Sequence, residues 1–268
     1  MSEVVVVTGI GGMGIACARR LGPGRELVVA DFNGEKLERE AETLRRDGLA
    51  VTPHVVDVSD RESVGRLAEA ASRLGALRTL VHTAGLSPTQ ATAERVLEVD
   101  MLGTDYVLAA FLELVTDGTV AVCIASMAGY MAALSPEQEF ALATAKTDDL
   151  LATLGPIGDD FGSTYGVAKR INQLRVEQAA APWGARGGRV VSISPGIIST
   201  PMGRQELEEG AGEQMQGMLD LSPIPRIGTA EDIASAVQWL ASPAASFVTG
   251  CDLRVDGGVT AAIRALMG

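Results

Sequence analysis

Residues 4–21 read VVVVTGIGGMGIACARRL, an apolar run, a glycine-rich turn and a stretch with helical spacing in direct succession. This order is typical of dinucleotide-binding proteins, because glycines let the backbone approach a pyrophosphate and the helix N-terminus faces its charge. The turn residues expected at the phosphates are Gly9, Gly11, Gly12, Met13 and Gly14. A tight turn that needs glycine only for its backbone conformation is the alternative.

An acidic residue follows the second strand-like run, residues 27–30, and stands 22 positions after Gly9. At this spacing, Asp31 is expected to accept hydrogen bonds from the adenosine ribose hydroxyls, with Phe32 beside it. A 2'-phosphate would meet a like charge there, with no basic residue in the glycine turn, so the sequence favours NAD over NADP. A surface aspartate that caps the next helix is the alternative reading of Asp31.

The same alternation continues along the chain of 268 residues, 47% of which are hydrophobic and 4% aromatic. Strand-like apolar runs occur at residues 4–7, 27–30, 51–56, 79–82, 120–125, 189–193 and 251–255. Helical spacing occurs at 34–47, 60–74 and 230–240, with Asn33 and Ser59 or Asp60 as starting caps. We therefore expect one α/β domain over residues 1–268, a doubly wound Rossmann fold with a single parallel sheet and helices on both faces.

The composition excludes several classes of partner. A net charge of -12 disfavours nucleic acid and anionic lipid, and no apolar stretch is long enough to span a bilayer. The cysteines Cys17, Cys123 and Cys251 are odd in number and far apart, so we expect buried thiols and no metal site. The chain begins Met1-Ser2-Glu3 and enters a strand-like run at once, unlike a secretory signal. A cytoplasmic protein is expected.

A second motif carries candidate chemistry. Tyr165 and Lys169 stand at i and i+4, so they project from one helical face and the ammonium can favour ionisation of the phenol. Ser126 comes at the end of a strand, in the run Ile124–Gly129. The alternative makes Ser126 a strand-end cap and Tyr165 a core aromatic with a satisfied hydroxyl.

These motifs occur in an order that resembles the short-chain dehydrogenase/reductase family over nearly the whole chain. The matching landmarks are the glycine turn, Asp31, Asp57-Val58, His82-Thr83-Ala84-Gly85, Ser126, Tyr165, Lys169, Pro195-Gly196 through Thr200, and Asp256-Gly257-Gly258. The resemblance implies seven parallel strands, adenine contacts from Asp57 and Val58, and a close approach of Thr83, Ala84 and Gly85 to the cofactor. It also implies that the loop after Pro195 and Gly196 holds the nicotinamide carboxamide through Ile198 and Thr200.

The resemblance further implies reversible hydride transfer between NAD(H) and a secondary alcohol or ketone. Tyr165 would exchange the proton, Ser126 would hydrogen-bond the substrate oxygen, and Lys169 would bind the nicotinamide ribose and lower the pKa of the phenol. A tyrosine titrates near ~10 when unperturbed, so this role near neutrality needs adjacent positive charge.

The chain departs from the family pattern in four places. Its turn reads TGxxGMG, one residue shorter than the usual TGxxxGxG. Asp100 occupies the place of an asparagine that supports a proton relay, and we expect it to alter the pH response unless it faces solvent. His82 replaces another common asparagine, and a structural role is expected for it. Ser126 and Tyr165 are 39 positions apart, about three times the usual interval.

The substrate and the assembly are less constrained by the sequence. A methionine-rich segment, 200–221, is typical of a mobile lid, and Met127, Tyr130 and Met131 could face it. These features favour a medium-sized apolar substrate such as a steroid, terpenoid or acyl-derived compound, unless the methionines only pack the lid. A sensor or scaffold that binds the dinucleotide without turnover, and an NAD-dependent epimerase or dehydratase, stay open.

The extra residues form a helical insertion near 130–163. Its stretch 136–154 carries a broken apolar stripe that needs cover from its own domain or from a partner. Because the insertion emerges near the helix that the family's tetramer packs, we expect a homo-oligomer that uses another surface, a dimer rather than a tetramer.

Overall fold

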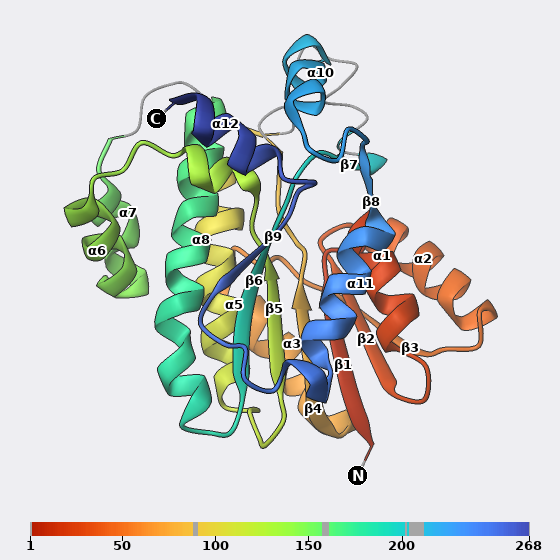
Figure 1. Cartoon of the computed structure of the whole chain (residues 1–268). Coiled ribbons are helices and arrows are strands. Elements are labelled where there is room, and N and C mark those ends of the chain that lie inside the picture. Colours follow the sequence, from red (N-terminus) through yellow and green to blue (C-terminus); the bar gives the residue numbers. More distant parts are fainter. Residues whose placement is uncertain (1, 88–90, 157–160, 202, 204–211, 268) are drawn as a thin grey trace.

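Seven parallel strands form one sheet at the centre of the protein (Figure 1). This computed structural model describes residues 2–87, 91–156, 161–201, 203 and 212–267. The strands are β1 (Glu3–Thr8), β2 (Glu26–Asp31), β3 (Ala50–Val55), β4 (Ala76–His82), β5 (Val120–Ile124), β6 (Arg189–Pro195) and β9 (Asp252–Val255). Their order is β3-β2-β1-β4-β5-β6-β9, which confirms the predicted doubly wound fold.

The valines of β1 explain why the sheet is covered on both faces. Val5 and Val7 belong to one buried cluster, whereas Val4 and Val6 belong to the other, because successive side chains of a strand point to opposite faces. All four are fully buried. Helices α1 (Gly12–Leu21), α2 (Gly34–Arg46) and α11 (Ala230–Ala241) cover the first face. Helices α3 (Arg61–Leu74), α5 (Gly103–Leu112) and α8 (Phe161–Gly184) cover the second.

The helix starts follow local capping chemistry. Asn33 accepts a hydrogen bond from the backbone N–H of Lys36, and Asp60 accepts one from that of Glu62, so both predicted caps are confirmed. Helix α1 begins at Gly12, so the last residues of the glycine turn already belong to the helix.

β1 and β4 are neighbours within the sheet. From β1 the strand order runs outward to β3, and from β4 it runs outward in the opposite direction to β9, so the topology switches between β1 and β4. In such sheets, ligands bind outside the carboxyl ends of the strands at this switch point. The same edge carries α10 (Gly212–Leu221) and α12 (Val259–Met267), near the C-terminus in Figure 1. A separate two-stranded ribbon, β7 (Ile198–Ser199) with β8 (Gly228–Thr229), was not predicted.

The stretch 136–154 is not one helix. It divides into α6 (Pro136–Thr144), a short turn η3 (Thr147–Asp149) and α7 (Leu150–Leu154), which lie outside α8 in Figure 1. The guanidinium of Arg175 on α8 donates to the carbonyls of Ala143 and Ala145, at 2.9 and 2.7 Å, and pairs with Asp105 of α5 at 2.8 Å. These contacts hold the carbonyls at the end of α6 and fix the break in the helix.

The apolar stripe of the insertion is largely covered by its own domain. Leu142 and Leu150 are fully buried in a cluster with Val167 and Ile171 of α8 and with Val96, Leu97 and Met101. Phe140 and Leu151 are exposed. Cover by a partner is therefore not required for the buried part of the stripe, and self-association stays a prediction.

The three cysteines differ in burial. Cys17 and Cys123 are buried, as predicted, whereas Cys251 is only half-buried, because it lies one residue before the short edge strand β9. Within the described residues, no group of three histidines, cysteines or acids could hold a metal ion. The described helices include none long and apolar enough to cross a membrane.

Candidate active site

A cavity of about 800 Å³ opens at the carboxyl edge of the sheet, beside β1 and β4. Its walls come from the glycine turn and from the residues that follow β2, β3 and β4. Thirteen of the residues selected from the sequence line it, namely Gly9, Gly11, Gly12, Met13, Gly14, Asp31, Phe32, Asp57, Val58, Thr83, Ala84, Gly85 and Thr200. The fold thus brings together residues spread over almost 200 positions of the chain.

The glycines of the turn have different tasks. Gly9 has a φ of 81°, and a Cβ there would overlap the backbone of Ala84, while a Cβ at Gly14 would overlap the carbonyl oxygen of Gly9. These two glycines allow β1, α1 and β4 to meet. A Cβ at Gly11 would have no heavy atom within 4 Å, so its missing side chain leaves the backbone open to the cavity. Open backbone at a helix N-terminus suits a pyrophosphate.

Asp31 is held by the glycine turn and by α2. One carboxylate oxygen accepts the backbone N–H of Ile10 at 2.8 Å, the other accepts that of Asn33 at 3.0 Å, and Lys36 Nζ lies 3.5 Å away. Lys36 and Arg39 also line the cavity. Sequence reasoning missed both, because it considered basic residues only in the turn. Positive charge on α2 therefore offsets part of the repulsion that Asp31 would exert on a 2'-phosphate.

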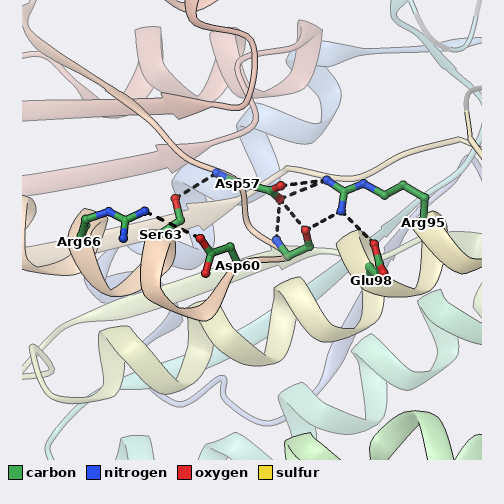
Figure 2. Close-up of polar contacts among 7 residues, drawn as sticks. Asp57, Asp60, Ser63, Arg66, Arg95 and Glu98 are labelled. Atoms are coloured by element: carbon green, nitrogen blue, oxygen red, sulfur yellow. Dashed lines mark hydrogen bonds and ion pairs between the residues drawn. The ribbon is translucent and has the colours of Figure 1, made fainter.

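Asp57 also lines the cavity, and it belongs to an ion-pair network (Figure 2). Arg95 of α4 (Ala93–Val96) donates through Nη2 to both carboxylate oxygens, at 3.3 and 3.0 Å, and through Nη1 to Ser59 and Glu98. Burial alone would raise the pKa of Asp57, but hydrogen bonds from Ser59 and Arg95 outweigh it and lower that pKa. Arg95 had no sequence signal, since a single arginine in a short helix fits no motif. The expected adenine contact of Asp57 must share its oxygens with Arg95.

Lys169 is the buried charge of the site, with 4% of its surface exposed. Its Nζ lies 5.5 Å from the centre of the Tyr165 ring, 3.7 Å from Asp100 Oδ1, and 3.4 Å from the carbonyl oxygen of Ile124, to which it donates. Gly85 connects this group to the cavity, because a Cβ there would lie 2.7 Å from Asp100 Oδ1 and 3.1 Å from Lys169 Nζ. Tyr165 and Lys169 therefore meet as the helical spacing predicted, and Asp100 faces the lysine rather than solvent.

The charge state of this pair follows from its surroundings. Burial opposes the ammonium, but the Asp100 carboxylate more than compensates and the pKa of Lys169 is raised. Burial also raises the pKa of Asp100, with Lys169 and the backbone N–H of Leu86 acting against it. Leu86 donates to Oδ1 at 2.9 Å, whereas Oδ2 has no hydrogen-bond partner within the described part of the chain. The donors around Oδ1 stabilise the ionised pair.

Ser126 begins the turn η2 (Met127–Met131) two residues after β5. Its Oγ accepts the backbone N–H of Ala128 at 3.2 Å, which leaves the hydroxyl proton available for another acceptor. Tyr130, in contrast, is turned to β9, where its hydroxyl donates to Asp252 at 2.9 Å and Arg254 lies 5.2 Å from its ring centre.

The remaining predicted residues lie around a second cavity of about 420 Å³. Gly196 and Ile198 line it together with Leu219 of α10 and Ile224, while Thr200 lines the larger cavity. Pro195 ends β6, directly before this loop. Of the expected lid, residues 202 and 204–211 lie outside the described residues, as do 157–160 of the insertion.

His82 is a neutral structural residue in this geometry. Thr104 donates its hydroxyl proton to the carbonyl oxygen of Asp100 at 2.7 Å, so it can only accept from His82 Nε2, 3.2 Å away. Nδ1 then accepts from the hydroxyl of Thr8 at 2.7 Å. Burial and, secondarily, Lys169 lower the pKa of His82 to about 3. The imidazole thereby joins the glycine turn to the helix that carries Asp100.

The switch-point cavity and its open glycine backbone define a nucleotide-binding protein of the doubly wound α/β class. Residues 3–136 match the family model described as short chain dehydrogenase, and residues 156–260 match the model described as Enoyl-(Acyl carrier protein) reductase. The chain belongs to the short-chain dehydrogenase/reductase family, oxidoreductases that bind nicotinamide dinucleotides. The two matched ranges leave residues 137–155 between them, most of α6 and all of α7.

Similar proteins cover nearly the whole chain. Short-chain dehydrogenase/reductase bsc3 of Alternaria brassicicola is 38% identical over 263 residues, which cover 97% of this chain and 96% of that protein. Galactitol 2-dehydrogenase (L-tagatose-forming) of Cereibacter sphaeroides is 32% identical over 266 residues, with 95% and 93% covered. A solved short-chain type dehydrogenase/reductase from Mycobacterium ulcerans has a TM-score of 0.78 at 27% identity, with 97% and 90% covered.

The depressed pKa of His82 predicts a specific loss of stability in acid. Its pKa is about 3 in the folded protein and 6.5 ordinarily, so its contribution is complete above about pH 6.5 and declines as the pH falls towards 3. The slope of the free energy of unfolding against pH from this one group reaches ~1.4 kcal/mol per unit. Urea unfolding of His82→Asn should show a shallower slope than the wild type in that window. His54→Asn changes the other histidine, which is half-exposed, and should alter the slope less. Equal slopes in all three proteins would contradict this account.

Proposed function

We propose that the protein transfers a hydride between NAD(H) and a secondary alcohol or ketone. The observation that carries the proposal is the buried Lys169 ammonium, 5.5 Å from the Tyr165 ring and joined through Gly85 to the cavity at the switch point. A buried ammonium beside a phenol favours the phenolate, and a phenolate is a base strong enough to accept the proton of an alcohol.

Each residue then has one task in alcohol oxidation. Ser126 hydrogen-bonds the substrate oxygen with its free hydroxyl proton, and Tyr165 accepts the proton of that oxygen. Lys169 keeps the phenol acidic and would bind the nicotinamide ribose, while Asp100 keeps Lys169 charged. The bound nicotinamide supplies the acceptor of the hydride released by the carbinol carbon. Ketone reduction uses the same groups, with Tyr165 donating the proton.

The described residues suit a nicotinamide dinucleotide. The open backbone at Gly11 and the N-terminus of α1 would hold the pyrophosphate, and the loop through Ile198 and Thr200 would hold the carboxamide. Asp31 ends β2 and lines the cavity, where its carboxylate would accept hydrogen bonds from the adenosine ribose, which favours NAD. Because Lys36 lies beside that carboxylate, the preference is expected to rest on hydrogen bonds to the ribose more than on net charge.

The proposed substrate is of medium size and mainly apolar. Support comes from the second cavity, which Ile197, Ile198 and Leu219 line beside the nicotinamide loop. The similarity to galactitol 2-dehydrogenase makes a polyol the competing substrate class. Cytoplasmic residence and self-association stay predictions.

Reduction of NAD+ and of NADP+, followed at the absorbance of the reduced nicotinamide, tests the proposal with 2-octanol, cyclohexanol, 2,3-butanediol and galactitol. We expect turnover with NAD+ and a higher kcat/KM for an apolar alcohol. Tyr165→Phe should bind NADH normally, measured by fluorescence, and lose ~10²–10⁴ in kcat, because it lacks the positioned acid and base.

Other results would point to other functions. NADH binding without turnover across the panel would support a sensor, and product formation without a net absorbance change would support an epimerase or dehydratase. A wild type that prefers NADP+ would overturn the cofactor assignment, and normal turnover by Tyr165→Phe would overturn the catalytic one.

Asp100→Asn should move the pH dependence of alcohol oxidation without abolishing it. The carboxylate lies 3.7 Å from Lys169 Nζ and stabilises the buried ammonium. Its removal lowers the pKa of Lys169, so less positive charge favours the phenolate of Tyr165 and the acid limb of kcat/KM should shift to higher pH, by about one unit or less. Glu98→Gln removes a more exposed acid near the same helix and should leave the profile in place. An unchanged profile in Asp100→Asn, or a shift to lower pH, would exclude the proposed role.

A further inference from the structure

The inserted helix α6 is connected by polar contacts to the turn that carries Ser126. Glu139 on α6 forms a bidentate ion pair with Arg170 of α8, from Nε at 2.6 Å and from Nη2 at 2.8 Å. Both side chains are mostly buried, with exposed fractions of 29% and 22%. A paired fork of this kind fixes the plane of the guanidinium, so it also fixes where the remaining nitrogen points.

That remaining nitrogen reaches a buried amide. Arg170 Nη1 donates to Gln173 Oε1 at 3.0 Å, and Gln173 Nε2 donates to the carbonyl oxygen of Ser126 at 3.3 Å and to Ser194 Oγ at 2.9 Å. The guanidinium can only donate and the carbonyl can only accept, so the amide of Gln173 has one satisfactory orientation. Gln173 is completely buried, and a reversed amide would set two acceptors against each other.

The carbonyl that Gln173 holds also defines the conformation of η2. The oxygen of Ser126 accepts the backbone N–H of Gly129 at 3.1 Å, which closes the first turn after the serine. A Cβ at Gly129 would lie 2.9 Å from both Gln173 Nε2 and the backbone nitrogen of Arg170. Because Gly129 has no side chain, the backbone of η2 packs directly against these two residues. Displacement of the Gln173 amide therefore removes the side-chain donor that holds the Ser126 carbonyl and frees the turn against which it packs.

We propose that Glu139 is a positioning residue that, through Arg170 and Gln173, fixes the backbone turn that presents the Ser126 hydroxyl. The inference rests on the proposed function, because Ser126 is there the group that binds the substrate oxygen. It gives the extra segment of this chain a task in catalysis.

Attachment of the insertion alone does not account for these contacts. Arg175 already fixes the end of α6 through Asp105 and through the carbonyls of Ala143 and Ala145, and Leu142 is buried in the same region. Within the described part of the chain, the polar contacts of Arg175 lead to α5 and to the end of α6, and none of them leads to η2. The two anchors can therefore be separated by substitution.

The test compares Glu139→Ala and Arg170→Lys with two controls. Arg170→Lys keeps the charge opposite Glu139 but cannot bridge the carboxylate and Gln173 with a planar fork. Glu137→Ala removes an exposed acid of the same helix that bonds only to Ser135 among the described side chains, and Asp105→Asn weakens the second anchor. We expect kcat for 2-octanol oxidation to fall about tenfold in the first two variants, because small misplacement of a reacting group is costly. The Kd for NADH should stay within twofold of the wild type in all four variants. The kcat of the two controls should also stay within twofold.

Two further measurements separate positioning from general damage. In a double-mutant cycle, Glu139→Ala combined with Gln173→Leu should be no slower than Gln173→Leu alone, since both act on one chain of contacts. Amide hydrogen exchange of residues 126–131 should accelerate in Glu139→Ala and Arg170→Lys, and not in Glu137→Ala or Asp105→Asn. The exchange measurement requires no substrate, and it can be made even if the Gln173→Leu variant does not fold.

Any of three results would overturn the inference. The first is that the two substitutions of the cycle have multiplicative effects on kcat, and the second is that Asp105→Asn loses as much kcat as Glu139→Ala. The third is that amide hydrogen exchange at residues 126–131 does not change. Absence of turnover in the wild type would instead reject the proposed function, and the exchange measurement would then decide the positioning role of Glu139 on its own.

Discussion

One ammonium group, buried between β5 and the helix that follows β4, sets the conditions for the rest of the site. Lys169 needs a counter-charge, because an isolated ammonium in the protein interior would lose its proton or destabilise the fold. Asp100 supplies that charge at 3.7 Å, and its carboxylate is in turn held by the backbone N–H of Leu86. The absence of a side chain at Gly85 lets the pair lie directly behind the cavity wall. Placement of a positive charge next to Tyr165 thus depends on α8, which carries Lys169, on the helix that carries Asp100, and on the turn of Gly85 and Leu86 after β4.

Close packing of backbone at the same place explains the glycines. The turn after β1 can approach β4 only because Gly9 and Gly14 have no Cβ, and His82 then ties the end of β4 to Thr8 and Thr104. An asparagine at position 82 would have the same kind of donor and acceptor, but the imidazole spans a longer gap between its two hydroxyl partners. In this chain the histidine therefore links the end of β1, directly before the glycine turn, to the helix that carries Asp100.

The sequence predicted those features that depend on local pattern. Continuous valine runs predicted the parallel sheet, Asn33 and Asp60 predicted helix starts, and the spacing of Tyr165 and Lys169 predicted their contact. The pattern did not predict partners brought in from distant elements. Arg95 reaches Asp57 from a four-residue helix 38 positions further along the chain. Lys36 lies in the first turn of α2, near Asp31 in sequence, and was missed because basic residues were considered only in the glycine turn. The break after α6 was missed because it is imposed by Arg175, a residue 30 positions further along the chain.

Lysine NMR can measure whether Asp100 keeps Lys169 protonated. Lys36, Lys146 and Lys169 are the three lysines in the sequence, so ¹³C-labelled lysine gives three ε-carbon signals that Lys36→Arg and Lys146→Arg assign. A pH titration should give a pKa for Lys169 above the ordinary value of 10.5, and Asp100→Asn should lower it. A Lys169 that titrates below 10.5 in the wild type, or whose pKa is the same in Asp100→Asn, would contradict the account.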